Sequence, residues 1–339
     1  MNEFKFLSSK EEEKLSREEL IKYYEEARKY LKASKYQYFT EKGILKREKL
    51  NPSIRKLLTK IFKFDINVSG LENIPEGPVI FACSHQDFYD ITNSIYANPR
   101  HALTLNASTV RWIIKAMLVF NGAIFVEREN KESRRMSKEE MERSLAKGRS
   151  INMYPEATLN CTPSKLHLPF FIGMIDMAKK MGVPVIPVVQ EYTYDDTKLD
   201  GKTHVKSVDI CYGRPIYVSV DDDRLEKLAE FDEVFSTIRW DLIEKKGTFK
   251  RDDIPMEYYP NFIRTRIRDW KIPGNDIYEE RKQVYRWDDD FYLFYHVNDV
   301  DFDENNNLLE TEYVRFLNAL YKKHLEADYK FKKLKRKKD

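Results

Sequence analysis

Short apolar runs alternate with helix-like stretches through the middle of the sequence. Each run is bounded by turn residues or polar segments, which is typical of buried strands in an α/β protein. A further segment, VKSVDICYGRPIYVSV (205–220), has turn residues at its centre and predicts a closing hairpin. The pattern predicts an α/β fold with a mixed, largely buried sheet flanked by helices. The runs are GPVIFACS (77–84), HALTLN (101–106), GAIFVER (122–128), SINMYP (150–155) and VPVIPVVQEY (183–192).

Helical patterns occupy both ends of the chain. Residues 9–33 and 309–333 are rich in charged helix formers and lack strand-like runs. The α/β domain is therefore expected to carry an N-terminal and a C-terminal helical addition. The predicted boundaries are 1–64 for the N-terminal helical segment, 65–222 for the α/β domain and 223–339 for the C-terminal extension.

A basic amphipathic stretch, NPSIRKLLTKIFKFD (51–65), permits two interpretations. Its apolar residues share one helical face, and its lysines and arginine lie off that face. An ordinary helix would turn the apolar face toward the core. An interfacial helix would instead rest that face on an anionic lipid surface.

Charge is spread unevenly along the chain of 339 residues. The formal net charge is only +3, but residues 322–339 contain nine Lys/Arg and three Asp/Glu, a net of +6. Such a tail suits an anionic membrane surface. Nucleic-acid binding through the same tail is the alternative, but no aromatic-basic motif supports it, so no nucleic-acid partner is expected.

The apolar stretches and cysteines exclude several protein classes. The N-terminus lacks the apolar run of a signal peptide, and residues 112–126 fall short of the ~20 residues that span a bilayer. Cys83, Cys161 and Cys211 have no short spacing, so neither a disulfide framework nor a zinc motif is predicted. We expect a cytoplasmic protein that associates peripherally with the inner face of the cell membrane.

Ionisable residues follow three of the predicted strands. His85 follows the run 77–84, Arg128 ends the run at 122–128, and Glu156 follows the strand-like residues of SINMYP. Reactive groups in open α/β sheets collect at the carboxyl ends of the strands. A base, a cation and a carboxylate are therefore expected to share one cleft.

His85 and Asp90 form a candidate general-base pair. Histidine titrates close to neutral pH, which suits removal of a proton from a hydroxyl. Asp90 would bond the far ring nitrogen and stabilise the imidazolium. No serine nucleophile is evidently partnered, which favours direct attack by the substrate's own hydroxyl. In the alternative interpretation, His85 caps a helix and Asp90 lies on the surface.

Four blocks in order make the pattern specific. SHQDFYD (84–90), GAIFVERE (122–129), YPEATLN (154–160) and VPVIPV (183–188) resemble the blocks of the PlsC-like glycerolipid acyltransferases. That family has His-x4-Asp, then Phe-Val-x-Arg, then Phe-Pro-Glu-Gly-Thr, then an apolar strand with proline. The resemblance covers about residues 65–220 and implies a glycerol-3-phosphate acyltransferase-like fold.

The resemblance also implies roles for the matching residues. His85 would deprotonate the acceptor hydroxyl and Asp90 would orient the ring. Arg128 would hold the acceptor's phosphate, Glu156 would contact its polyol end, and the backbone around Thr158 would help to fix the site. The donor would be acyl-CoA or acyl-carrier protein, with no cofactor and no metal. Residues 109–120 would line an acyl channel or simply pack in the core.

The third block departs from the family pattern. Ala157 stands where the family has glycine, and Leu159-Asn160 stands where it often has Arg-Ser. Lys165 would substitute for the missing phosphate-binding cation. The implied acceptor is 1-acylglycerol 3-phosphate in bacterial-type phospholipid synthesis. Glycerol 3-phosphate, another lysophospholipid and a saccharide hydroxyl remain alternatives, as does an inactive membrane-binding module.

A second, weaker motif lies near the C-terminus. DFDENNNLLETE (301–312) fits an EF-hand calcium loop through Asp301, Asp303, Asn305 and Glu312. No second hand is visible to pair with it. The alternative is a solvated acidic turn between helices.

Overall fold

The computed structural model describes residues 4–87, 89–100, 102–107, 122–127, 130–157, 160, 166–168, 170–194 and 205–246. Two compact units divide the chain. The first unit contains residues 1–157, 169–193 and 206–235, and it holds the sheet. The second unit contains residues 158–168, 194–205 and 236–339; within it, Arg239 donates a hydrogen bond to the Leu166 carbonyl.

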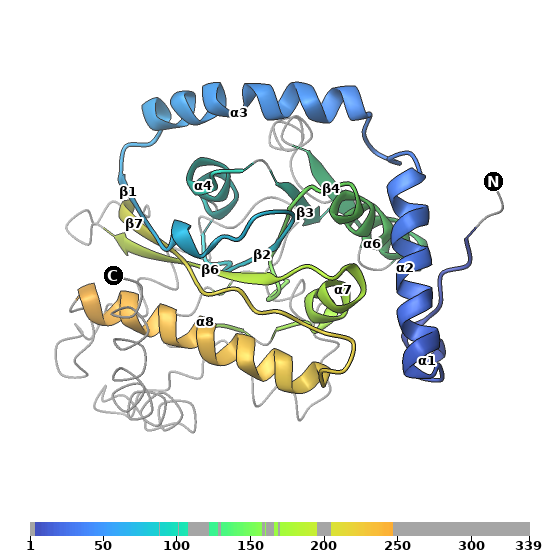
Figure 1. Cartoon of the computed structure of the whole chain (residues 1–339). Helices are drawn as coiled ribbons and strands as arrows, with labels where there is room; N and C mark the ends of the chain where they lie inside the picture. Colours follow the sequence, from blue (N-terminus) through green and yellow to red (C-terminus); the bar gives the residue numbers. More distant parts are fainter. Residues whose placement is uncertain are drawn as a thin grey trace. The chain divides into compact units, whose positions relative to one another are not determined.

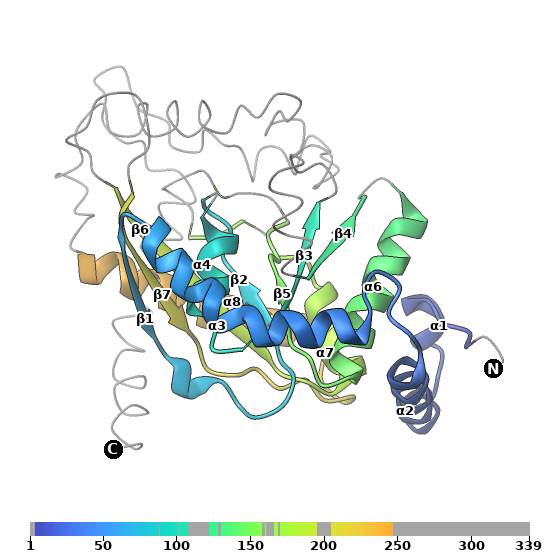
Figure 2. The same ribbon diagram turned by 90° about the horizontal axis from the view of Figure 1, so that it is seen from above.

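One seven-stranded sheet forms the centre of the first unit, with the strand order β1-β7-β6-β2-β5-β3-β4. The pairs β2–β5, β5–β3 and β3–β4 are parallel, and β6 is parallel to β2. Figure 2 shows these strands side by side. The strands are β1 (Asp65–Ser69), β2 (Ile80–Cys83), β3 (Leu103–Ala107), β4 (Ala123–Val126), β5 (Ile151–Met153), β6 (Val185–Tyr194) and β7 (Val205–Tyr212).

Helices cover both faces of this sheet. Figure 1 shows α3 and α4 on one side and α7 on the other, which confirms the predicted α/β fold with a mixed, buried sheet. The helices are α1 (Ser9–Glu12), α2 (Arg17–Ala33), α3 (Glu41–Ile61), α4 (Asp90–Ala97), α6 (Lys131–Ala146), α7 (Gly173–Met181) and α8 (Arg224–Lys246), with a 3-10 turn at Leu71–Asn73.

The predicted buried runs all contain strands, and their side chains explain why. Strand β2 is buried at every position, as is expected of a strand covered on both faces. The hydrophobic pattern of the sequence did not predict the first strand, β1. Residues of β1 alternate between exposed and half-buried, and it pairs with β7 at the edge of the sheet. A half-exposed edge strand has no continuous apolar run to reveal it.

The predicted hairpin at 205–220 is wrong. The chain does not reverse after β7: Gly213 donates a hydrogen bond to the Pro187 carbonyl, and Ile216 then pairs antiparallel with Val185. Both contacts lie along β6, so the whole segment runs in one direction beside that strand. The glycine and proline that resemble a reversal only interrupt the strand.

The N-terminal helices begin at hydroxyl caps. Ser16 and Glu19 form a reciprocal capping box, which separates α1 from α2 and divides the predicted helix at 9–33. Thr40 caps α3, whose start lies well before the predicted stretch. Helix α2 packs against α6 and α7, and α3 packs against α4.

Helix α3 matches neither interpretation of its amphipathic stretch completely. Leu58 is buried, as a core-facing helix requires. Leu57 and Ile61 are 57% and 58% exposed, although they belong to the same predicted apolar face. Because helix neighbours one position apart diverge by about 100°, the core takes only one edge of the apolar stripe.

Several predicted features lie outside the described residues. These are the segment 109–120, the calcium-loop residues Asp301, Asp303, Asn305 and Glu312, and the basic tail. Among the helices in the described ranges, none is both long and apolar enough to cross a membrane.

Candidate active site

The candidate site lies at the carboxyl ends of neighbouring strands. His85 follows β2, and Glu156 follows β5, which pairs with β2 in parallel. Parallel neighbours end at the same edge of a sheet, so two residues that are 71 positions apart in the chain come into contact. The sequence prediction that strand ends converge is confirmed for this pair.

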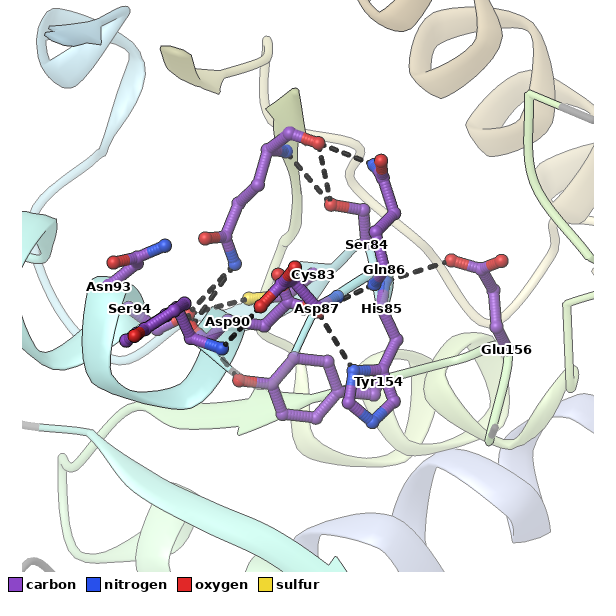
Figure 3. A network of polar contacts seen from close by, with 12 residues as sticks. Cys83, Ser84, His85, Gln86, Asp87, Asp90, Asn93, Ser94, Tyr154 and Glu156 are labelled. Atoms are coloured by element: carbon purple, nitrogen blue, oxygen red, sulfur yellow. Dashed lines mark hydrogen bonds and ion pairs between the residues drawn. The ribbon is translucent and has the colours of Figure 1, made fainter. Parts of the chain in front are cut away.

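His85 is bonded to Asp90. The Nδ1 atom of His85 lies 3.0 Å from Oδ2 of Asp90 (Figure 3). Because a carboxylate only accepts hydrogen bonds, this contact places the ring proton on Nδ1 and leaves the lone pair on Nε2. The His85 side chain is 20% exposed and that of Asp90 is fully buried, so the imidazole is the accessible member of the pair.

The turn between these residues is built around the carboxylate of Asp90. Its Oδ2 atom also accepts hydrogen bonds from the backbone amides of Gln86 at 2.6 Å and Asp87 at 2.8 Å. Asp90 is the first residue of α4, where a negative charge is favoured by the helix dipole. The alternative interpretation, in which Asp90 lies on the surface, is wrong.

Glu156 holds the backbone of the histidine. Its Oε1 atom accepts the hydrogen bond of the His85 amide at 3.0 Å, and its side chain is buried (Figure 3). His85 is thereby fixed at its main chain by Glu156 and at its ring by Asp90. The predicted contact between Glu156 and the acceptor's polyol end stays a prediction.

An aromatic ring and a thiol lie against the pair. The ring centroid of Tyr154 lies 4.6 Å from that of His85, with an angle of 37° between the planes. Burial raises the pKa of the Tyr154 hydroxyl well above its usual range. Burial also raises the pKa of the Cys83 thiol to about 12. Both groups are therefore neutral at physiological pH.

Ala157 adopts the backbone conformation that glycine usually supplies. Its φ is +55°, and Ala157 is the non-glycine residue with positive φ in the described part of the chain. An L-residue in this region costs about 1–2 kcal/mol. The substitution noted in the third block therefore leaves the turn after β5 intact but strained.

Sequence reasoning missed the polar residues of β6 that reach the site. Tyr192 donates a hydrogen bond from its hydroxyl to Oδ1 of Asp90 at 2.5 Å, and the Gln190 side chain donates to the Asp90 carbonyl at 3.2 Å. Both residues are buried. Two polar residues at alternating positions near the end of an apolar strand are the pattern that would have indicated them.

The other predicted site residues lie outside the described residues. These are Arg128, Thr158 and Lys165. Strand β4, which precedes Arg128, joins the same parallel set through β3 and β5, so its carboxyl end lies at the same edge as His85. In the described ranges, no three His, Cys, Asp or Glu residues are placed to hold a metal ion.

A separate hollow of about 480 Å³ does not belong to this site. It lies where strands begin, and its lining includes Arg28, Lys29 and Lys32 of α2. Helices α6 and α7 end beside it at Ala146 and Met181, and the lysines and arginine suit the partial negative charge of helix ends.

The sequence around this geometry matches a known family. Residues 65–191 match the family described as Acyltransferase. This segment of the chain is therefore similar to acyltransferase domains. The match includes His85, Asp90 and Glu156, together with most of strand β6.

Curated relatives of the acyltransferase domain share one name. The 1-acyl-sn-glycerol-3-phosphate acyltransferase of Borreliella burgdorferi is 29% identical over 192 residues, which is 55% of this chain and 73% of that protein. The chloroplastic 1-acyl-sn-glycerol-3-phosphate acyltransferase BAT2 of Brassica napus is 27% identical over 202 residues, or 54% of this chain and 56% of the relative.

Other matches cover smaller shares. The chain spans 41% of the length of the Caenorhabditis elegans relative acl-2, at 28% identity over 34% of this chain. Among solved structures, the 1-acyl-sn-glycerophosphate (LPA) acyltransferase PlsC of Thermotoga maritima is similar with a TM-score of 0.48 and 21% identity, over 60% of this chain and 83% of that chain.

Proposed function

We propose that this protein transfers a fatty acyl group to the free hydroxyl of 1-acylglycerol 3-phosphate. One observation carries the proposal: the His85–Asp90 pair has a buried carboxylate on Nδ1 and a partly exposed ring at the carboxyl edge of the sheet. The names of the relatives from Borreliella and Brassica support the acceptor.

The proposed reaction needs one base and no covalent enzyme intermediate. Nε2 of His85 takes the proton of the acceptor hydroxyl while the hydroxyl oxygen attacks the thioester carbonyl of acyl-CoA or acyl-carrier protein. A C–O bond forms, the C–S bond breaks, and the imidazolium returns the proton to the departing thiolate. Asp90 stabilises the imidazolium during these steps.

Nearby hydroxyls and the thiol are poor nucleophiles. The Ser84 hydroxyl is buried and accepts the Gln190 amide at 2.8 Å, and that of Ser94 donates to the Asp90 carbonyl at 2.8 Å. Cys83 is buried and protonated, as its raised pKa requires. These contacts favour direct attack by the acceptor over an acyl-enzyme.

The reaction and the acceptor are tested by one product assay. Labelled acyl-CoA and acyl-carrier protein would be offered with 1-acylglycerol 3-phosphate, glycerol 3-phosphate, other lysophospholipids and a saccharide. We expect labelled diacylglycerol phosphate from the wild type and far less from His85→Ala. Transfer to a different acceptor would reassign the substrate, and no product with any acceptor would favour the inactive membrane-binding module.

We also propose that α3 docks the protein on an anionic membrane, peripherally and from the cytoplasmic side. Leu57 and Ile61 are exposed on α3 and lie among exposed Lys56 and Lys60. The helix leads into Phe62, whose ring lies 6.2 Å from that of Tyr89, directly before Asp90. Lipid at this helix would therefore lie close to the site.

Vesicle flotation tests the docking surface. Leu57→Glu with Ile61→Glu should abolish binding to vesicles of phosphatidylglycerol and phosphatidylcholine, because buried apolar area and charge attraction both decrease. Leu225→Glu is the matched control, since Leu225 is 65% exposed on α8. Equal binding by the α3 variant and the control would overturn this docking surface.

A further inference from the structure

Strand β6 extends beyond the end of β2, its neighbour in the sheet. Its last paired position with β2 is Val188, opposite Cys83, yet β6 continues to Tyr194. Side chains alternate along a strand, so Gln190 and Tyr192 lie on the same face as Val188. That extension reaches the turn that joins His85 to α4.

Tyr192 bonds the carboxylate oxygen that His85 does not use. Oδ2 of Asp90 faces His85 and two backbone amides, whereas Oδ1 accepts the Tyr192 hydroxyl at 2.5 Å. The Asn93 amide donates to the same hydroxyl oxygen at 2.8 Å. Because Asn93 is a donor here, the single hydroxyl proton of Tyr192 is directed toward Asp90.

Gln190 secures the two ends of the same turn. Its backbone amide donates to the Ser84 hydroxyl at 2.8 Å, and its side chain donates to the Asp90 carbonyl at 3.2 Å. Its carbonyl accepts the side-chain amide of Gln86. The carboxylate of Asp90 is therefore held from β6 as well as from its own turn.

We propose that Tyr192 is a positioning residue for acyl transfer, which fixes Asp90 so that Asp90 fixes the proton of His85 on Nδ1. This proposal rests on the proposed function. Tyr192 is 5% exposed and lies behind Asp90, so it acts through the carboxylate and not on the substrate. Without the hydroxyl, Oδ1 loses this donor, and the carboxylate is held through Oδ2 alone, which weakens its orientation toward the ring.

The consequence is a loss of turnover without a loss of substrate affinity. Hydrogen bonds to charged groups are worth about 1.5–3 kcal/mol, so Tyr192→Phe should lower kcat by about 10- to 100-fold. The KM values for donor and acceptor should stay as in the wild type. In a His85→Ala background, Tyr192→Phe should not lower kcat further, because the ring that Asp90 orients is absent.

Tyr24→Phe is the matched control. Tyr24 is 4% exposed, and its hydroxyl also donates to a carboxylate, Glu12, at 3.2 Å. Both variants remove a buried tyrosine hydroxyl from a carboxylate, but only one touches Asp90. The control should lose a similar amount of thermal stability and keep the wild-type kcat.

Nitrogen-15 NMR of the histidine rings gives a readout that does not depend on turnover. The chain has six histidines, so the His85 signals can be assigned with His85→Ala. We expect the Nδ1–H form to dominate in the wild type and in Tyr24→Phe, and the Nε2–H population to rise in Tyr192→Phe.

The two proposals fail separately. A wild-type tautomer and wild-type kcat in Tyr192→Phe would overturn the positioning role, and so would a further drop in the His85→Ala background. Absence of acyl transfer by the wild type would overturn the proposed function alone, because the tautomer ratio still decides what Tyr192 does to His85.

Discussion

Two buried carboxylates of the first unit are held in nearly the same way. Asp90 accepts the consecutive amides of Gln86 and Asp87 and bonds His85. Glu140 accepts the consecutive amides of Gln37 and Tyr38, at 3.0 and 3.1 Å, and bonds Arg143. Both acids are completely buried. The exposure of the partner is an important difference between them.

Arg143, the partner of Glu140, is shielded from solvent, whereas His85, the partner of Asp90, is partly exposed. Arg143 is buried and gives another hydrogen bond to the Ser34 hydroxyl at 2.7 Å. His85 has a side chain that is 20% exposed. A buried charge alone does not identify a catalytic site. The exposure of the partner is what distinguishes the two pairs.

The largest expected effect is a loss of activity without a loss of stability at His85. His85→Ala should lower acyl transfer by ~10²–10⁴-fold, the usual contribution of a general base. Its melting temperature should stay close to that of the wild type, because the ring is partly exposed. A steady-state assay and a thermal scan measure both. Retention of full activity would refute the assignment of His85 as the base.

Glu140→Ala should behave in the opposite way. Removal of one partner from a buried ion pair costs about 3–5 kcal/mol, because Arg143 is left without its counter-charge. Urea unfolding should show this loss, whereas the folded fraction should keep the wild-type kcat. Glu140→Leu combined with Arg143→Met should recover much of the stability. A kcat decrease of the size seen for His85→Ala would remove the distinction between the two sites.

Alkaline pH should weaken both regions together. Burial raises the pKa of Cys83 beside Asp90 and of Tyr36 near Glu140 to about 12 in each case. A folded pKa above the unfolded value gives stability that is complete below the unfolded pKa and is lost as pH rises toward the folded one. We expect Cys83 alone to contribute a loss of about 2–3 kcal/mol between pH 8 and pH 10.5, because its unfolded value is ~8.5.

Urea midpoints across that pH range measure this effect. Cys83→Ala removes the thiol and should flatten most of the slope between pH 8 and pH 10. An unchanged slope in that variant would show that the thiol does not cause the pH dependence.

The smallest effect concerns backbone strain beside the catalytic pair. Ala157→Gly relieves an unfavourable φ of +55° but adds chain entropy, so we expect stabilisation by at most about 1 kcal/mol. Ala27→Gly, inside α2, should instead destabilise by at least about 1 kcal/mol. Matched urea curves compare the two. Equal destabilisation would mean that Ala157 is not strained.

The sequence predicted the His85–Asp90 contact because the information for it is local. His85 and Asp90 are five positions apart and stand directly after a buried apolar run. The residues after β5 were equally recognisable, since Glu156 also follows an apolar run. Parallel strands then bring such positions to one edge without any further information.

Contacts between distant segments could not be predicted in this way. Tyr192 lies 102 positions from Asp90, and Glu140 lies 102 positions from Tyr38. Helix α6 has the charged composition of a surface helix, yet Glu139, Glu140, Glu142 and Arg143 are buried. The packing of α6 against α2, α7 and the sheet explains this burial. The edge strand β1 was missed for the related reason that its pattern is half-exposed.

The spacing of the catalytic pair is itself set by hydrogen bonds. Gln86 and Asp87, which lie between His85 and Asp90, donate backbone hydrogen bonds to the Asp90 carboxylate, so they act through their main chain. An inserted or deleted residue would move these nitrogens out of reach, whatever its side chain. The length of this segment is therefore under tighter physical constraint than the chemistry of the side chains within it.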